Sequence, residues 1–348
     1  MKHLPGTRSL TTPRLPGEGR LRRGAVPRPA VAALLAALCL ATACNHESAG
    51  NPGVPAAGPL QGQEARPFDS ARAWKDLTSL VGIGARASGT PGAESTRQYL
   101  ERELKAVGLE PQRESFREET PVGPLDFTNV YVDLPPAPGK AAASAPWILL
   151  CTHYDTKRLP QFVGANDAGS GTAVLLELAR ALAPGKTRPV GYRLVFLDGE
   201  EAVNPEWRDP DNRYGSRHHA AKLREAKRAS SFKACVLLDM VGDKDLLLQQ
   251  EGYSDAGLFA LFAGAARELG LSKHMATRRS GEILDDHLSF MAVGIRAVNL
   301  IDFDYGPNNA YWHTPEDKLE NCSEASLGVV GRVVLRGLPS LERQLTGR

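Results

Sequence analysis

The sequence predicts a single α/β domain over about residues 66–348, built on a largely parallel sheet. Short apolar runs at residues 194–197, 234–238 and 295–301 are typical of strands that are buried on both faces of a sheet. Amphipathic helical patterns alternate with these runs, and such alternation indicates parallel strands joined by helices. No internal repeat interrupts the pattern, so we expect one domain.

The first half of this domain begins with two predicted helices. Asp69 or Ser70 can cap the first helix, and Thr90-Pro91 can start the second, which Gly108 ends. A glycine-rich turn then opens a third helix along the apolar residues of segment 174–182. Strands are expected between these helices at residues 112–117, 127–134 and 147–152, with a Pro- and Ala-rich surface loop at residues 135–146.

The second half repeats the alternation of buried strands and helices. The strand at residues 194–197 is followed by an irregular loop and then by a polar helix after residue 217. The next expected elements are a strand at residues 234–238, an amphipathic helix at 254–269, a strand at 295–301, a loop at 302–310 and a final helix at about 323–341.

Charge and composition exclude some classes of protein. The chain is 42% hydrophobic and 24% charged, which is typical of a globular protein. Seven of the 42 basic residues but only one of the 40 acidic residues lie within residues 1–43, so the rest of the chain carries a net charge of −4. That remainder lacks the basic surface that a nucleic-acid partner requires, and we expect no such partner.

The N-terminal 43 residues are typical of a targeting segment. A basic stretch precedes the apolar residues 31–40, which are too few to span a bilayer, and small residues lead to Cys44. This junction resembles the lipobox of bacterial lipoproteins, which implies a lipid anchor at Cys44 and a place in the bacterial cell envelope. The alternative is an ordinary signal peptide. Residues 44–65, rich in Gly, Ala and Pro, suit a flexible tether to the catalytic domain at residues 66–348.

Two adjacent glutamates, Glu200 and Glu201, follow the strand at residues 194–197. Neighbouring side chains on extended backbone point to opposite sides, so one carboxylate can bind a metal while the other stays free to carry a proton. In open α/β sheets, ligands bind outside the carboxyl ends of strands, where this pair lies. Alone, such a pair is more typical of a solvated loop.

Further polar residues stand close to strand ends or helix starts. His153 and Asp155 share one face of an extended chain, which suits a metal-binding imidazole whose tautomer is fixed by the carboxylate behind it. Asp167 lies in a turn that lacks the spacing of phosphate-binding loops, and it is either a metal ligand or a helix cap. Trp207 is either a pocket wall or part of the core, and we favour the wall.

The edge of the sheet is the expected meeting point of these side chains. The carboxyl ends of parallel strands lie along one edge, so we expect five ligands to converge there: His153, Asp167, Glu201, Asp239 and His313. Nitrogen and oxygen ligands without a thiolate suit zinc in an open catalytic site. The cysteines of the domain are three in number and irregularly spaced, which predicts neither a disulfide framework nor a Cys-x-x-Cys zinc site.

Several short motifs carry a family resemblance over about residues 70–345. They are His-Tyr-Asp-Thr-Lys (153–157), Phe-Val-Gly-Ala-Asn-Asp (162–167), Asp-Gly-Glu-Glu-Ala (198–202), Tyr-Gly-Ser-Arg-His (214–218), Asp-Asp-His (285–287) and Trp-His-Thr (312–314). With them the sequence resembles the zinc aminopeptidases and, more closely, the animal-type glutaminyl cyclases that share their fold. The resemblance implies a zinc-exopeptidase-like α/β/α sandwich with a mostly parallel, mixed central sheet.

The two branches of that superfamily imply different roles for the same positions. In the cyclase branch, one zinc is held by Asp167, Glu201 and His313. The proton network then comprises Glu200, Asp239 and Asp285, and the pocket is lined by Trp207 and Trp312. In the aminopeptidase branch there are two zinc ions, which Asp167 bridges, and Glu200 is the general base. The other metal ligands in that branch are His153, Glu201, Asp239 and His313.

Three functions are therefore weighed. The first is a cyclase that forms pyroglutamate at peptide or protein N-termini and releases ammonia. The second is an aminopeptidase, which the motif Asn-Asp-Ala-Gly-Ser-Gly (166–171) and the lack of a partner for Cys151 at the disulfide position of the animal cyclases keep open. The third is a binding domain that has lost its activity.

Overall fold

The computed structural model of the protein describes residues 65–139, 142–185 and 187–347. The expected signal peptide, Cys44 and the tether up to residue 64 lie outside the described residues. None of the helices in the described segments is long and apolar enough to cross a membrane.

Within the described residues, eight strands form one mixed sheet in the order β1-β2-β4-β3-β5-β8-β6-β7. The four central strands run parallel to one another: β3 (Trp147–His153), β4 (Gly191–Leu197), β5 (Phe232–Asp239) and β8 (Ala297–Ile301). One edge is an antiparallel hairpin of β1 (Gln112–Thr120) and β2 (Gly123–Leu134), and the other edge consists of β6 (Leu248–Gln250) and β7 (Met275–Arg279).

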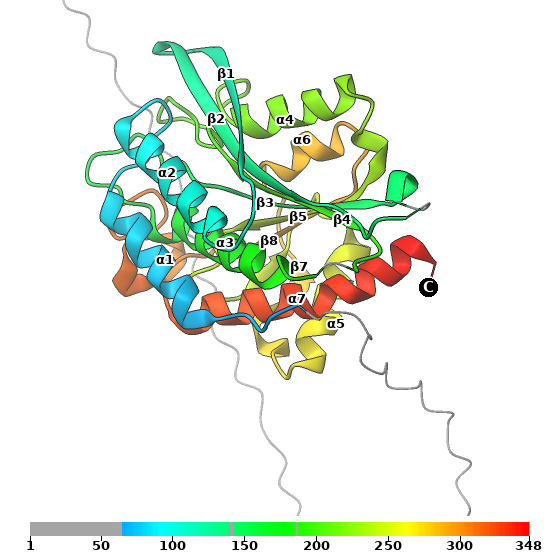
Figure 1. The fold of residues 1–348 in the computed structure, drawn as a ribbon. Coiled ribbons are helices and arrows are strands. Elements are labelled where there is room, and N and C mark those ends of the chain that lie inside the picture. Colours follow the sequence, from blue (N-terminus) through cyan, green and yellow to red (C-terminus); the bar gives the residue numbers. More distant parts are fainter. Residues whose placement is uncertain (1–64, 140–141, 186, 348) are drawn as a thin grey trace, which may run out of the picture. The chain divides into compact units, whose positions relative to one another are not determined.

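Helices cover both faces of this sheet (Figure 1). One face is covered by α1 (Ser70–Ile83), α2 (Pro91–Lys105), α3 (Gly171–Leu182), α5 (Ala256–Glu268) and α7 (Glu324–Thr346). The opposite face is covered by α4 (Tyr214–Glu225) and α6 (His287–Met291). The predicted α/β/α sandwich with a mostly parallel, mixed sheet is thereby confirmed.

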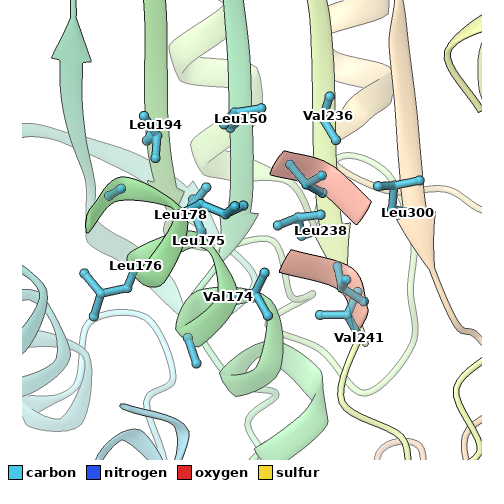
Figure 2. Packing of buried hydrophobic residues seen from close by; sticks show 14 of the residues in the cluster. Leu150, Val174, Leu175, Leu176, Leu178, Leu194, Val236, Leu238, Val241 and Leu300 are labelled. Carbon is cyan, nitrogen blue, oxygen red and sulfur yellow. The ribbon is translucent and has the colours of Figure 1, made fainter. Parts of the chain in front are cut away.

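The largest apolar core lies between the sheet and α3. Figure 2 shows leucine and valine side chains of the central strands, among them Leu150, Leu194 and Val236, directed toward Val174 and Leu178 of α3. All of these side chains are buried, and each contributes about 1.5–3 kcal/mol through its removal from water. Because every residue of α3 is buried, this helix holds a fixed position against the sheet.

The start of α3 approaches the strands unusually closely at Gly171. A Cβ atom at this position would lie 2.3 Å from Thr152 Oγ1 and 2.5 Å from the carbonyl oxygen of Leu238. Only glycine therefore lets the helix begin here without displacing β3 or β5. The close approach brings the turn that precedes α3 to the carboxyl ends of these two strands.

The local signals in the sequence identified most of these elements. Asp69 and Thr90 are the N-caps of α1 and α2, where their side chains accept hydrogen bonds from Arg72 N and Ala93 N. Cys151 and Cys235, expected to be buried on strands, lie on β3 and β5 as free thiols with Sγ atoms 3.6 Å apart. The short elements β6, β7 and α6 were not predicted, because segments of three to five residues show no clear periodicity.

Candidate active site

The carboxyl ends of the central strands bring separate segments of the chain together. His153 is the last residue of β3, Asp239 is the last residue of β5, and Glu200 and Glu201 follow β4 closely. Asp167 lies in the turn Ala165–Ser170 directly before α3. His313 comes from the loop after β8, and its Nε2 atom reaches the same edge. The parallel arrangement of the strands therefore creates one buried polar site.

Asp167, Glu201 and His313 form the first candidate metal-binding group. His313 Nε2 lies 3.1 Å from Glu201 Oε1 and 3.4 Å from Asp167 Oδ2. One ligand atom of each residue lies within 4.8 Å of those of the other two. The second oxygen of Glu201, Oε2, is buried without a hydrogen-bond partner. Two carboxylates and an imidazole around one point fit a zinc ion with an open coordination position.

A second group consists of His153, Asp167 and Asp239. His153 Nε2 lies 3.1 Å from Asp239 Oδ1 and 3.3 Å from Asp167 Oδ1. Asp167 thus belongs to both groups, with Oδ1 directed to His153 and Oδ2 to His313. The donor set can accommodate either one ion or two ions bridged by Asp167.

The charges of these groups are strongly coupled. Burial alone disfavours protonation of His313, but hydrogen bonds to Asp167 and Glu201 outweigh it and raise the pKa of His313 to about 10. Burial likewise disfavours ionisation of Asp167, but the two histidines lower the pKa of this carboxyl below its ordinary range. A metal ion must displace the proton of His313 to bind Nε2, so binding releases protons and weakens at low pH.

Glu200 is the buried carboxyl group next to the first metal-binding group. Burial raises its pKa well above the ordinary value of a glutamate; His153 opposes this shift and the negative charge of Asp285 adds to it. Burial and the charge of Asp239 raise the pKa of Asp285 to about 6. Asp285 Oδ2 accepts a hydrogen bond of 2.6 Å from Asn299 Nδ2, which orients it. Closely spaced carboxyl groups of this kind resist joint ionisation and can share a proton.

A cavity of about 240 Å³ opens onto these groups. Its lining includes Glu200, Asp239 and Asp285, the first metal-binding group, and the two indole rings of Trp207 and Trp312. Trp312 stacks on the imidazole of His313 with ring centroids 4.0 Å apart. Apolar residues such as Ile283 and Phe303 complete the wall. The cavity therefore has room for one small side chain and presents both carboxylate and apolar groups to it.

Asp155 contacts a different partner from the one that the sequence pattern suggested. Its Oδ1 atom lies 3.6 Å from His153 Nδ1, which is too long for a hydrogen bond. Instead, its two oxygens accept hydrogen bonds from the backbone N–H groups of Glu200 (3.1 Å) and Glu201 (3.2 Å). Asp155 therefore fixes the backbone of the glutamate pair, and it faces His153 Nδ1 without a hydrogen bond.

Lys157 is the last residue of the motif His-Tyr-Asp-Thr-Lys (153–157), and the sequence did not indicate a role for it. Its side chain is buried, and Nζ donates to the carbonyl oxygen of Ala202 at 3.0 Å and lies 3.5 Å from Glu201 Oε2. A buried cation beside Glu201 favours the ionised form of that carboxylate, which is the form that binds metal. The signal that could have identified it is the placement of a lysine four residues after His153 at a strand end.

Comparisons with known proteins agree with this geometry. The sequence model described as peptidase family M28 matches residues 129–338. A glutaminyl-peptide cyclotransferase-like protein of Mus musculus is 31% identical, over 77% of this chain and 74% of its own. The glutaminyl-peptide cyclotransferase of Bos taurus is 30% identical, over 72% of this chain and 76% of its own.

A solved structure has the same architecture. The glutaminyl cyclase of an Acidobacteriales bacterium superposes with a TM-score of 0.75 at 32% identity, covering 83% of this chain and 99% of its own. The segment that the family model matches includes every residue of the site described above. The chain therefore belongs to peptidase family M28 and, within it, to the branch of the glutaminyl-peptide cyclotransferases.

Proposed function

We propose that the protein is a zinc-dependent glutaminyl-peptide cyclotransferase, which converts an N-terminal glutamine of a peptide or protein to pyroglutamate and releases ammonia. The observation that carries this proposal is a free, buried carboxyl group, Glu200, next to a metal-binding group in a cavity lined by Trp207 and Trp312. The similarity to cyclotransferases over three quarters of the chain supports the same assignment.

The reaction moves one proton, in two transfers, from the amine to the departing nitrogen, and it uses no water. The α-amine attacks the γ-carboxamide carbon of the same residue, the ring C–N bond forms, and the bond to the amide nitrogen breaks. Glu200 takes a proton from the amine and gives it to the departing nitrogen, which leaves as ammonia. Its raised pKa suits a group that must both accept and donate a proton near neutral pH. Asp167, Glu201 and His313 would hold the zinc ion, which would supply Lewis-acid polarisation of the substrate carbonyl.

The remaining side chains of the cavity control protons and water. Burial and the charge of Asp239 raise the proton affinity of Asp285, so Asp285 can share the proton that Glu200 accepts. Trp207 and Trp312 line the cavity, so their indole rings would enclose the substrate side chain and exclude water from the attacked carbon. Exclusion of water favours cyclisation over hydrolysis of the carboxamide.

Aminopeptidase activity is the second candidate. The group formed by His153, Asp167 and Asp239 favours it, because this group could hold a second ion beside the first. In that reaction Glu200 would take a proton from water instead of from the substrate amine. One zinc per chain is expected for the cyclase and two for the peptidase.

Mass spectrometry of two peptides distinguishes these functions. We expect the purified protein to remove the mass of one ammonia from a peptide that begins with glutamine and to leave a peptide that begins with leucine unchanged. Removal of the leucine residue would support the aminopeptidase instead. A protein that changes neither peptide, although loaded with zinc, would favour a non-catalytic binding domain.

We further propose that the enzyme is anchored to a membrane of the bacterial cell envelope by a lipid on Cys44. The support is the order of basic residues, apolar residues 31–40, small residues and Cys44 in the sequence. Metabolic labelling of the full chain with a fatty acid should modify the wild-type protein and Cys39→Ala, but not Cys44→Ala. Equal labelling of Cys44→Ala would refute the anchor.

A further inference from the structure

The turn that carries Asp167 is held by one acidic residue, Asp317. Three consecutive backbone N–H groups of this turn donate to it: Ala165 N to the Asp317 carbonyl oxygen at 3.4 Å, Asn166 N to Oδ1 at 2.6 Å and Asp167 N to Oδ2 at 3.1 Å. Asp317 is completely buried. Because both carboxylate oxygens are used, the backbone at Asp167 can take only one orientation relative to Asp317.

The same residue is fixed to the segment that carries His313. Asp317 N donates to the carbonyl oxygen of Thr314 at 3.0 Å, which closes a turn directly after His313. The Tyr305 hydroxyl donates to Asp317 Oδ1 at 3.2 Å. Asp317 therefore links two of the three residues of the first metal-binding group, Asp167 and His313, which lie far apart in the sequence.

A second buried residue, Arg86, holds the turn from its other side. Its guanidinium donates to the carbonyl oxygens of Val163 at 2.7 Å and Gly164 at 2.8 Å. Gly164 has a φ of +51°, and a Cβ atom there would lie 2.0 Å from the carbonyl oxygen of Asp167. The ligand turn is thus fixed between Arg86 and Asp317, and it has little freedom to adjust.

The charge of Asp317 has an electrostatic consequence for the metal site. Among the residues that the structure describes, no lysine or arginine forms a close ion pair with its carboxylate, and the buried guanidinium of Arg86 compensates its charge only at longer range. A buried carboxylate beside that of Asp167 is unfavourable by itself, because like charges repel and both have lost water. A divalent cation on Asp167 reverses the sign of this interaction, so the same carboxylate favours the metal-bound state.

We propose that Asp317 is a positioning residue that sets zinc affinity by fixing Asp167 and His313 relative to each other. The inference rests on the proposed zinc-dependent function but concerns metal binding and not turnover. An asparagine at this position keeps the size of the side chain but presents an NH₂ group to one of the two backbone N–H donors. The turn must then shift, and Asp167 moves with it.

The test is the zinc dissociation constant, measured by competition with a chromophoric chelator, together with the visible spectrum of the Co²⁺-substituted protein. We expect Asp317→Asn to raise the dissociation constant by about 10- to 100-fold and to change the Co²⁺ spectrum. Glu316→Gln is the matched control, since Glu316 is an exposed neighbour whose carboxylate forms an ion pair with Lys318. This control should bind zinc as the wild-type protein does.

Tyr305→Phe makes the proposal testable if Asp317→Asn does not fold. This variant keeps the carboxylate and removes one hydrogen bond to it, so the dissociation constant should rise by about two- to tenfold. If Asp317→Asn folds and binds zinc with wild-type affinity, the proposal is overturned. If Asp317→Asn does not fold, wild-type zinc affinity in Tyr305→Phe overturns it. Wild-type protein that binds zinc but does not cyclise would refute the proposed function and leave this inference standing.

Discussion

Replacement of Glu200 by glutamine is expected to lower kcat/KM for cyclisation by about 10²- to 10⁴-fold, the usual contribution of a general base. Glutamine has nearly the same shape as glutamate, but it cannot accept the proton of the attacking amine. Glu200 is not part of the first metal-binding group, so zinc binding should be unchanged. Initial rates of ammonia release from a glutamine peptide, measured together with zinc content, check both parts.

Glu282→Gln is the control for this variant. Glu282 lines the same cavity, but it is an exposed carboxylate at its rim. Its replacement should change kcat/KM only slightly, so a large loss confined to Glu200→Gln indicates proton transfer and not a general effect of charge. If Glu200→Gln kept more than about a tenth of the wild-type kcat/KM, Glu200 would not be the base.

The pH dependence of cyclisation by the wild-type protein should show the ionisation of Glu200. Burial raises the pKa of Glu200 well above the ordinary value of 4.5, so the carboxylate that accepts the proton is lost as the pH falls from neutrality. Activity must therefore decrease at a higher pH than it would with an ordinary glutamate. The residual activity of Glu200→Gln should lack the part of this decrease that comes from Glu200.

Removal of the metal should have the second large effect. We expect dialysis against a chelator to lower the cyclisation rate by about 10³-fold or more, since Lewis-acid stabilisation is worth several kcal/mol in a transition state. Added zinc should restore activity to the wild-type protein but not to His313→Ala, which lacks one donor of the first group. His218→Ala is a suitable control, because His218 stacks on Phe116 of the β1–β2 hairpin.

Titration of the metal-free protein with zinc also decides the number of ions. Full activity at one equivalent per chain would agree with a cyclase that uses Asp167, Glu201 and His313. A requirement for two equivalents would assign a role to the second group, with His153 and Asp239. Activity that survives exhaustive removal of metal would contradict the zinc-dependent mechanism.

The sequence predicted the residues at strand ends better than their individual contacts. His153 and Asp239 end parallel strands, and such ends must lie along one edge, so their proximity follows from the topology alone. The contact of Asp155 with the backbone of Glu200 and Glu201 does not follow, because it depends on how the loop after β4 turns back toward β3. No spacing along the chain encodes that turn.

The role of Asp317 could not be predicted from the sequence for a related reason. Its partners are backbone N–H groups about 150 residues earlier in the chain, and every non-proline residue offers such a donor. Sequence therefore does not distinguish Asp317 from exposed acidic neighbours such as Glu316. Only burial and the position of the turn before α3 make the difference.

The site is assembled from segments that are distant in sequence, from the end of β3 to the loop after β8, and this has a thermodynamic consequence for the living cell. A partly folded chain that has not yet docked the loop after β8 offers a metal ion only an incomplete set of donors. Native-state ligand binding stabilises a fold by about 1.4 kcal/mol for each tenfold excess of free ligand over its dissociation constant. Scarcity of the ion would thus reduce the protein's lifetime against proteases as well as its turnover, so supply of a trace nutrient would govern its abundance.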